Sequence, residues 1–278
     1  MTADNLNNMR VIPDLLAINE KVRPNKVAYR QFDDKSKTWI SVTWKEFADM
    51  VRSWRKAFTA SGLSKGDHAA VLLPNSITAT ACDLSILSQG MVPVPLHAVD
   101  TPSSSAFILN NSEAKILFVT RTLRWNAMLN AQKEYPYLKL VVTTGNDAEG
   151  ASEDSPVPVV NLSDWLKQGE NTDLKEVSID PDDLAAIVYT SGTTGKPKGV
   201  MLTHDNVLSN VKSFSQVIDV GSDDVFLSFL PFSHTFERTV TFYFTLFLGA
   251  EVGFARSVLK LAEDLKIIRP TIFVAVPR

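Results

Sequence analysis

Short apolar runs alternate with amphipathic segments along most of the chain. Each run is almost continuously apolar, which is typical of strands buried on both faces, as in parallel sheets. The predicted strands cover residues 69–73, 115–119, 138–142, 184–189, 225–230 and 271–276. Near the N-terminus, residues 26–32 and 38–43 alternate apolar and polar positions across a DDKSK turn, which predicts a small hairpin.

Helical spacing of apolar residues fills the segments between the predicted strands. In the first predicted helix these residues are three or four positions apart, at Trp44, Phe47, Val51, Trp54 and Phe58. Thr43 and Glu46 form a capping-box pattern at its start, and Gly62 follows its end. Further helices are predicted over residues 77–87, 206–217 and 257–266. Cys82 lies among small residues in the first of these, where we interpret it as a core side chain rather than a nucleophile.

The alternation of strands and helices indicates right-handed crossovers and an α/β fold with doubly wound, mostly parallel sheets. We expect two lobes, one over residues 1–150 with the N-terminal hairpin and one over residues 151–278. Residues 144–157 hold four acidic residues and no lysine or arginine, so we interpret them as a solvated linker at the seam. The strand predicted at 271–276 has interior character and should lead into a crossover helix. We therefore expect the second lobe to be incomplete.

Composition and charge exclude several classes of protein. The 278 residues carry 28 Lys and Arg against 31 Asp and Glu, a net charge of 28 − 31 = −3, which does not fit a nucleic-acid-binding surface. A single cysteine excludes an internal disulfide framework and a CxxC site. The N-terminus lacks a signal-peptide core, and the longest apolar stretch, residues 239–250, is too short to cross a bilayer. We expect a cytoplasmic protein without a visible membrane anchor.

One window of the sequence is dense in glycine and hydroxyl residues. Residues 189–204 read YTSGTTGKPKGVMLTH and begin at the last residue of a predicted strand. Glycines let the backbone form a concave nest of N–H groups, hydroxyls add donors, and lysine adds a positive charge. This composition suits the binding of a polyphosphate. The window matches neither a Walker A loop nor a GxGxxG fingerprint, and GxSxG and HExxH do not occur in the sequence.

The segment YTSGTTGKPKGV resembles the phosphate-binding signature of the adenylate-forming superfamily, which includes acyl-CoA synthetases, peptide-synthetase adenylation domains and firefly-type luciferases. The upstream segments RPNKVAYR, TWKEF, AVLLPNS and GMVPVPLH resemble its first lobe in order and spacing, so the resemblance covers nearly the whole chain. It implies that seven consecutive residues bind the phosphates of ATP, namely Thr190, Ser191, Gly192, Thr193, Thr194, Gly195 and Lys196. It also implies that Mg²⁺ bridges phosphate oxygens, with Thr190 as its candidate protein ligand.

A second segment, LPFSHTFERT at residues 230–239, is similar to the next block of the same superfamily. In that block a histidine lies near the adenylate and acyl pocket, which makes His234 the candidate catalytic residue. The FERT ending resembles long-chain fatty-acid members in particular. Without a supporting motif, His68 and His97 are interpreted as ordinary structural histidines, and residues 205–206, directly after His204, as a helix cap.

The resemblance implies a two-step reaction of a fatty acid, ATP and coenzyme A. The carboxylate attacks the α-phosphate of ATP to give an acyl-adenylate and pyrophosphate, and the thiol of coenzyme A then displaces AMP. The chain thus resembles the N-terminal part of a long-chain fatty-acid–CoA ligase. Family members continue with an adenine- and metal-binding block and a small C-terminal catalytic domain, which this sequence does not match. We therefore expect the 278 residues alone to be inactive.

Several alternatives stay open at this stage. The enzyme could activate an aryl, short-chain or amino acid instead of a fatty acid. The chain could also be a truncated relative that binds nucleotide without catalysis. An enzyme with fatty substrates can associate peripherally with a membrane, and the sequence does not indicate an oligomeric state.

Overall fold

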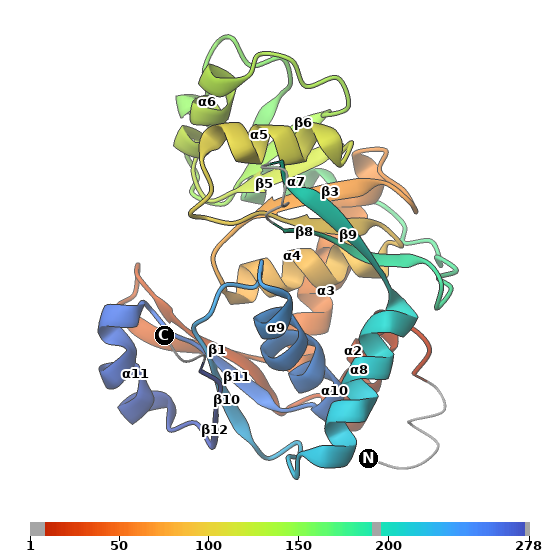
Figure 1. The fold of residues 1–278 in the computed structure, drawn as a ribbon, viewed down its shortest axis with the longest axis vertical. Coiled ribbons are helices and arrows are strands. Elements are labelled where there is room, and N and C mark those ends of the chain that lie inside the picture. Colours follow the sequence, from red (N-terminus) through yellow and green to blue (C-terminus); the bar gives the residue numbers. More distant parts are fainter. Residues whose placement is uncertain (1–8, 191–195, 276–278) are drawn as a thin grey trace.

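The computed structural model describes residues 9–190 and 196–275 of the chain (Figure 1). Its first sheet consists of five parallel strands in the order β4-β3-β5-β6-β7. The strands are β3 (His68–Leu72), β4 (Val92–Pro95), β5 (Ile116–Val119), β6 (Leu140–Thr143) and β7 (Val159–Asn161). The helices that follow these strands are α4 (Ile77–Ser88), α5 (Pro102–Asn111), α6 (Thr122–Ala131) and α7 (Leu162–Gln168), with the short turn η1 (Ala148–Gly150) before β7.

The second sheet also has five strands, in the order β12-β10-β11-β1-β2. These are β1 (Val27–Asp33), β2 (Thr38–Thr43), β10 (Val225–Ser228), β11 (Glu251–Phe254) and β12 (Ile272–Phe273). All neighbours are parallel except β1 and β2, which form an antiparallel hairpin. A separate two-stranded antiparallel sheet is formed by β8 (Leu184–Thr190) and β9 (Lys198–Thr203). The predicted α/β class with mostly parallel sheets is therefore confirmed.

From its position in the sequence we expected the N-terminal hairpin to belong to the first lobe. The structure shows that this expectation was wrong. Strand β1 pairs in parallel with β11, so the hairpin extends the sheet that the C-terminal strands form. The acidic segment at residues 144–157 connects β6 to β7 inside the first sheet and is not a seam between lobes. Both errors have one cause: the hairpin and the linker were recognised from local patterns, which do not specify the strand that pairs across a large sequence separation.

The helix signals in the sequence were more reliable. Helix α3 (Trp44–Ala60) begins with the predicted capping box, in which Thr43 Oγ1 accepts from the Glu46 N–H at 3.2 Å and Glu46 Oε2 accepts from the Thr43 N–H at 2.7 Å. The helix predicted at 257–266 is divided into a short turn, η3 (Val258–Lys260), and α11 (Leu261–Ile268). Among the described residues, no helix combines the length and apolarity needed to cross a membrane.

Helix α4 lies between the two large sheets and contributes to the hydrophobic cores of both (Figure 1). Ile77 and Leu84 pack in the core of the second sheet, together with helix α2 (Ile12–Val22) and helix α3. Cys82 and Ile86 pack in a core of the first sheet that includes Trp165. The Cys82 side chain is completely buried, and burial raises the pKa of its thiol, as expected for a core residue rather than a nucleophile.

A buried ion pair joins α4 to the segment that follows His234. Arg238 begins η2 (Arg238–Phe244), a π-helical turn between α9 (Thr235–Glu237) and α10 (Thr245–Leu248). Its Nη2 lies 2.6 Å from Asp83 Oδ1, and its Nε donates to Tyr243 Oη at 2.7 Å. The exposed fractions of the Arg238 and Asp83 side chains are only 2% and 6%. The pair therefore fixes the start of η2 against a helix that both sheets share.

Candidate functional site

The glycine-rich window forms the connection between two adjacent antiparallel strands. Strand β8 is buried over most of its length and ends at the exposed residue Thr190, which lies opposite Lys198 of β9. Lys196 lies just before β9 and is exposed. The other predicted phosphate-binding residues, Ser191, Gly192, Thr193, Thr194 and Gly195, lie outside the described residues. The two ends of the predicted phosphate loop are thus held side by side by the β8–β9 ladder.

A cleft of about 740 Å³ opens beside this connection. Thr190 and Pro197 contribute one wall, and Ser233 and His234 contribute another from the loop that follows β10. His97, from the loop that follows β4, also lines the cleft, together with Asp100, Ser103 and Ser104. The fold therefore brings Thr190 and His234, which were predicted separately from two sequence segments, into one cleft at the carboxyl ends of parallel strands, where α/β proteins bind ligands.

Two imidazole rings lie against each other in the cleft. The His97 and His234 ring centroids are 4.2 Å apart, with the rings inclined at 64°. The His97 Nδ1 is also 2.7 Å from Ser233 Oγ. Burial lowers the pKa of His97, the charge of a protonated His234 lowers it further, and Asp100 opposes both effects. At neutral pH His97 is therefore a neutral ring. It packs on His234 and forms a hydrogen bond with Ser233, the residue before His234.

The role of His97 in the cleft was missed in the sequence, where it was interpreted as an ordinary structural histidine. Its position two residues after the end of β4 gave one usable signal, because ligand sites gather at the carboxyl ends of parallel strands. The interpretation of His68 as a residue without a site role agrees with its contact, a 2.5 Å approach of Nδ1 to the Ser112 carbonyl oxygen away from the cleft.

His204 lies away from the cleft and ties together two helices. Helix α8 (His204–Val217) is capped by Thr203 and Asn206, so the capping prediction is confirmed for Asn206. The His204 ring is buried and its Nδ1 accepts the N–H of Ile12, the first residue of α2, at 3.2 Å. Burial lowers the pKa of His204 to about 4, so the ring is neutral at physiological pH.

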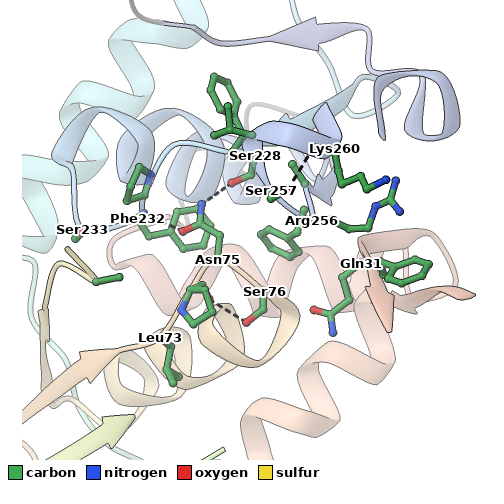
Figure 2. Close-up of a pocket in the computed structure, with 18 of the residues that line it drawn as sticks. Gln31, Leu73, Asn75, Ser76, Ser228, Phe232, Ser233, Arg256, Ser257 and Lys260 are labelled. Carbon is green, nitrogen blue, oxygen red and sulfur yellow. Dashed lines mark hydrogen bonds between the residues drawn. The ribbon is translucent and has the colours of Figure 1, made fainter. Parts of the chain in front are cut away.

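A second pocket adjoins the cleft at Ser233, which lines both (Figure 2). It has a volume of about 700 Å³ and lies between the two large sheets, at the carboxyl ends of β3, β10 and β11. Phe32, Phe229, Phe232 and Phe254 supply aromatic walls. Amide, hydroxyl and basic side chains complete the lining, among them Asn75, Ser228, Arg256 and Lys260. The cleft and this pocket are therefore adjacent, and aromatic rings line the second of them.

Glu237 is a buried carboxyl directly behind the pocket. Its side chain is almost completely buried; Oε1 accepts from Ser228 Oγ at 2.7 Å, and Oε2 lacks a hydrogen-bond partner among the described residues. Burial raises the pKa of Glu237 to about 7, against which its hydrogen bonds act. The carboxyl is therefore protonated in a large fraction of molecules at neutral pH.

This pKa gives a testable pH dependence. Because the folded pKa of Glu237 lies above the unfolded value, its contribution to stability is complete at low pH and is lost as the pH rises toward 7. His204 acts in the opposite direction, since its folded pKa lies below the unfolded value. We expect the free energy of unfolding of Glu237→Gln, relative to wild type, to increase by about 2 kcal/mol between pH 5 and pH 8. Urea titrations at several pH values measure it, and a pH-independent difference would contradict the assignment.

The fold and the cleft together define an α/β protein with mostly parallel sheets and a cleft at the carboxyl ends of β4 and β10. The model of the AMP-binding enzyme family matches residues 16–278. The chain belongs to the AMP-binding enzyme family.

Relatives of the chain are much longer than the chain itself. It is 37% identical over 222 residues to the peroxisomal long chain acyl-CoA synthetase 6 of Arabidopsis thaliana, a match that covers 78% of this chain and 31% of that protein. The N-terminal domain of FACL13 from Mycobacterium tuberculosis is similar in structure, with a TM-score of 0.78, 25% identity, and coverage of 97% and 63%. The anthranilate CoA ligase AuaEII in complex with anthranoyl-AMP shares the fold, with a TM-score of 0.84, 22% identity, and coverage of 98% and 51%. The chain spans about a third of the length of the first curated relatives it matches.

Proposed function

We propose that this chain is the N-terminal part of an ATP-dependent long-chain fatty-acid–CoA ligase. Membership of the AMP-binding family and the names of the relatives support this proposal. The main observation in its favour is that Thr190 and His234 line one cleft. These residues come from the two sequence segments that resemble blocks of the adenylate-forming superfamily. In the proposed reaction, a carboxylate oxygen attacks the α-phosphorus of ATP, and the bond to the bridging oxygen of the leaving pyrophosphate breaks.

In this proposal the connection between β8 and β9 binds the β- and γ-phosphates of ATP. Thr190 and Lys196 stand at its two ends, and residues 191–195 supply the rest of the cradle. The lysine ammonium offsets negative charge on the pyrophosphate, and such positioning and neutralisation are the main requirements of substitution at phosphorus. The Thr190 hydroxyl, at the edge of the cleft, is the proposed protein ligand of Mg²⁺.

The described residues fit a magnesium ion that is held mostly by the nucleotide. Within residues 9–190 and 196–275, no group of three His, Cys, Asp or Glu side chains is arranged to hold a metal. Mg²⁺ keeps several waters and is usually bound through one or two carboxylates plus substrate phosphates, so the Thr190 hydroxyl would add one protein oxygen to a set supplied mainly by the nucleotide and water. When bound, the ion would neutralise charge on the phosphate oxygens.

We propose that His234 lies near the reacting carboxylate and α-phosphate, and that His97 holds the His234 ring in place. His234 and His97 line the same cleft as Thr190, and their rings contact each other. The aromatic pocket beyond Ser233 is the proposed space for an apolar portion of a substrate, where burial of each methylene group contributes about 0.8 kcal/mol. In the second step the thiol of coenzyme A attacks the acyl carbon, loses its proton, and releases AMP.

A panel of acids tests the proposed substrate class. In a protein that carries this chain together with the segment with which its relatives continue, we expect thioester formation to be fastest with palmitate or another long-chain acid. Acetate, benzoate and amino acids serve as the competing classes. Mass spectrometry of the coenzyme A products measures the rates, and a faster rate with an aryl, short-chain or amino acid would replace the fatty-acid proposal.

The other finer predictions remain proposals. The 278 residues alone are expected not to release pyrophosphate from ATP with palmitate, and turnover by that chain would refute this. The cytoplasmic location stays a prediction, since a relative is named as peroxisomal. Peripheral membrane association likewise stays a prediction.

A further inference from the structure

The side-chain amide of Asn75 holds the loop that leads to His234, and Figure 2 shows it beside Ser228 and Phe232 of that loop. Asn75 lies between β3 and α4. Its Nδ2 donates to Ser228 Oγ at 2.8 Å and to the Leu230 carbonyl oxygen at 2.6 Å. Its Oδ1 accepts the N–H of Phe232 at 3.0 Å. The loop of residues 228–232, which begins at the last residue of β10, is thereby tied to the other sheet.

The chain of hydrogen bonds continues past the loop to the helix behind it. Ser228 accepts from Asn75 and donates its own hydroxyl proton to Glu237 Oε1 at 2.7 Å. Glu237 ends α9, the short helix that directly follows His234. Asn75, Ser228 and Glu237 thus form a directed series of bonds that connects the residues on both sides of His234. Ser228 and Glu237 are each only 1% exposed, so water does not compete for these bonds.

The geometry points to Asn75 as a positioning residue for His234. Asn75 lines the neighbouring aromatic pocket and not the cleft that contains His234, so its effect on His234 is transmitted through the loop that it holds. The same loop continues into Ser233 and His234, which contact His97 from the first sheet. The contact between the two imidazole rings therefore depends on how the loop after β10 is held against the first sheet, and the three hydrogen bonds of Asn75 hold this loop beside it. This role rests on the proposed function of the cleft.

Asn75→Asp is the sharpest variant, because it preserves the shape of the side chain. The aspartate keeps an oxygen for the Phe232 N–H but loses both donated bonds, to Ser228 and to Leu230. In the protein extended as its relatives are, we expect kcat for palmitate-dependent adenylation to fall about tenfold to a hundredfold, since displacements near 1 Å can cost that much. The KM for ATP should change less than about twofold, because the β8–β9 connection is untouched.

Asn126 offers a matched control far from the cleft. It is also an asparagine that ties a loop, with Nδ2 bonded to the Gly150 carbonyl oxygen and Oδ1 to the Ser152 N–H, both at 2.9 Å. Asn126→Asp should leave kcat within about twofold of wild type while it costs similar stability. An equal fall in kcat for both variants would overturn the proposal, because it would reduce the effect at Asn75 to a general loss of folding.

A double-mutant cycle of Asn75→Asp with His234→Ala separates an effect of Asn75 on the position of His234 from its effect on stability. If Asn75 acts through His234, Asn75→Asp should change kcat by less than about twofold on a His234→Ala background, while its cost in stability persists. Full additivity in kcat would overturn the proposal. In parallel, nuclear Overhauser contacts between the His97 and His234 rings in the 278-residue chain should be present in wild type and weakened in Asn75→Asp. Rings that stay in contact in the variant would overturn the positioning role even if the proposed enzymatic function had itself failed.

Discussion

Replacing Asp83 by alanine is expected to lower the free energy of unfolding by about 3–5 kcal/mol, the usual cost of breaking a buried ion pair. The variant leaves the Arg238 guanidinium, which is 2% exposed, without its anionic partner between α4 and η2. The remaining bond to Tyr243 Oη does not neutralise the charge. Since α4 contributes residues to the cores of both sheets, the loss should lower the free energy of global unfolding and not only loosen one segment. Urea denaturation of the 278-residue chain measures it.

Two control variants sharpen this prediction. Asp34→Ala removes the acid of an exposed pair with Lys37, whose side chains are 91% and 71% exposed, and should cost less than about 1 kcal/mol. The double variant Asp83→Leu with Arg238→Met replaces both charges by apolar groups and should recover much of the lost stability. If Asp83→Ala proved no more costly than Asp34→Ala, the assignment of a buried, stabilising ion pair would be wrong.

Replacing Lys196 by alanine is expected to have a large effect on the proposed chemistry at the ATP phosphates. Lys196 stands where the connection from β8 enters β9, and its ammonium is the proposed partner of the ATP phosphates. Hydrogen bonds to charged groups contribute about 1.5–3 kcal/mol, which corresponds to a loss of about tenfold to a hundredfold in kcat/KM for ATP. Steady-state kinetics of adenylation with ATP as the varied substrate provide the measurement.

Lys133→Ala is a matched control for that loss. Lys133 is another exposed lysine, 65% exposed and 4.0 Å from Asp154, and it lies outside the cleft. Its replacement should leave kcat/KM for ATP within about twofold of wild type. Equal kinetics of the Lys196 and Lys133 variants would refute the assignment of Lys196 to the phosphates.

Local patterns were sufficient to predict most elements of the fold. Continuous apolar runs identified β3, β5 and β8, and the Thr43–Glu46 pattern located the start of α3 to the residue. Sheet membership could not be read in the same way. The hairpin β1–β2 is antiparallel within itself, and nothing in its own residues indicates that β11, more than 200 positions later, pairs with its free edge. Pairing across such separations depends on the packed whole.

Only part of the candidate site could be predicted from the sequence, and the reason is the same. Thr190, Lys196 and His234 belong to contiguous motifs, so the sequence identified them without the fold. His97 and Asn75 have no motif around them, because their partners are distant in the chain: Ser233 is 136 positions from His97, and Phe232 is 157 positions from Asn75. Their importance arises only when the carboxyl ends of β3, β4 and β10 meet, which is a property of the sheets and not of any segment.

Exchange of labelled pyrophosphate into ATP tests the central proposal most directly, because it reports the adenylation step without the second substrate. The protein that contains this chain and the continuation found in its relatives should catalyse exchange when palmitate is present and should show only background exchange without an acid. Exchange should also fall about tenfold or more in the Lys196→Ala variant. A folded wild-type protein that binds no ATP and exchanges no pyrophosphate with any carboxylic acid would contradict the account.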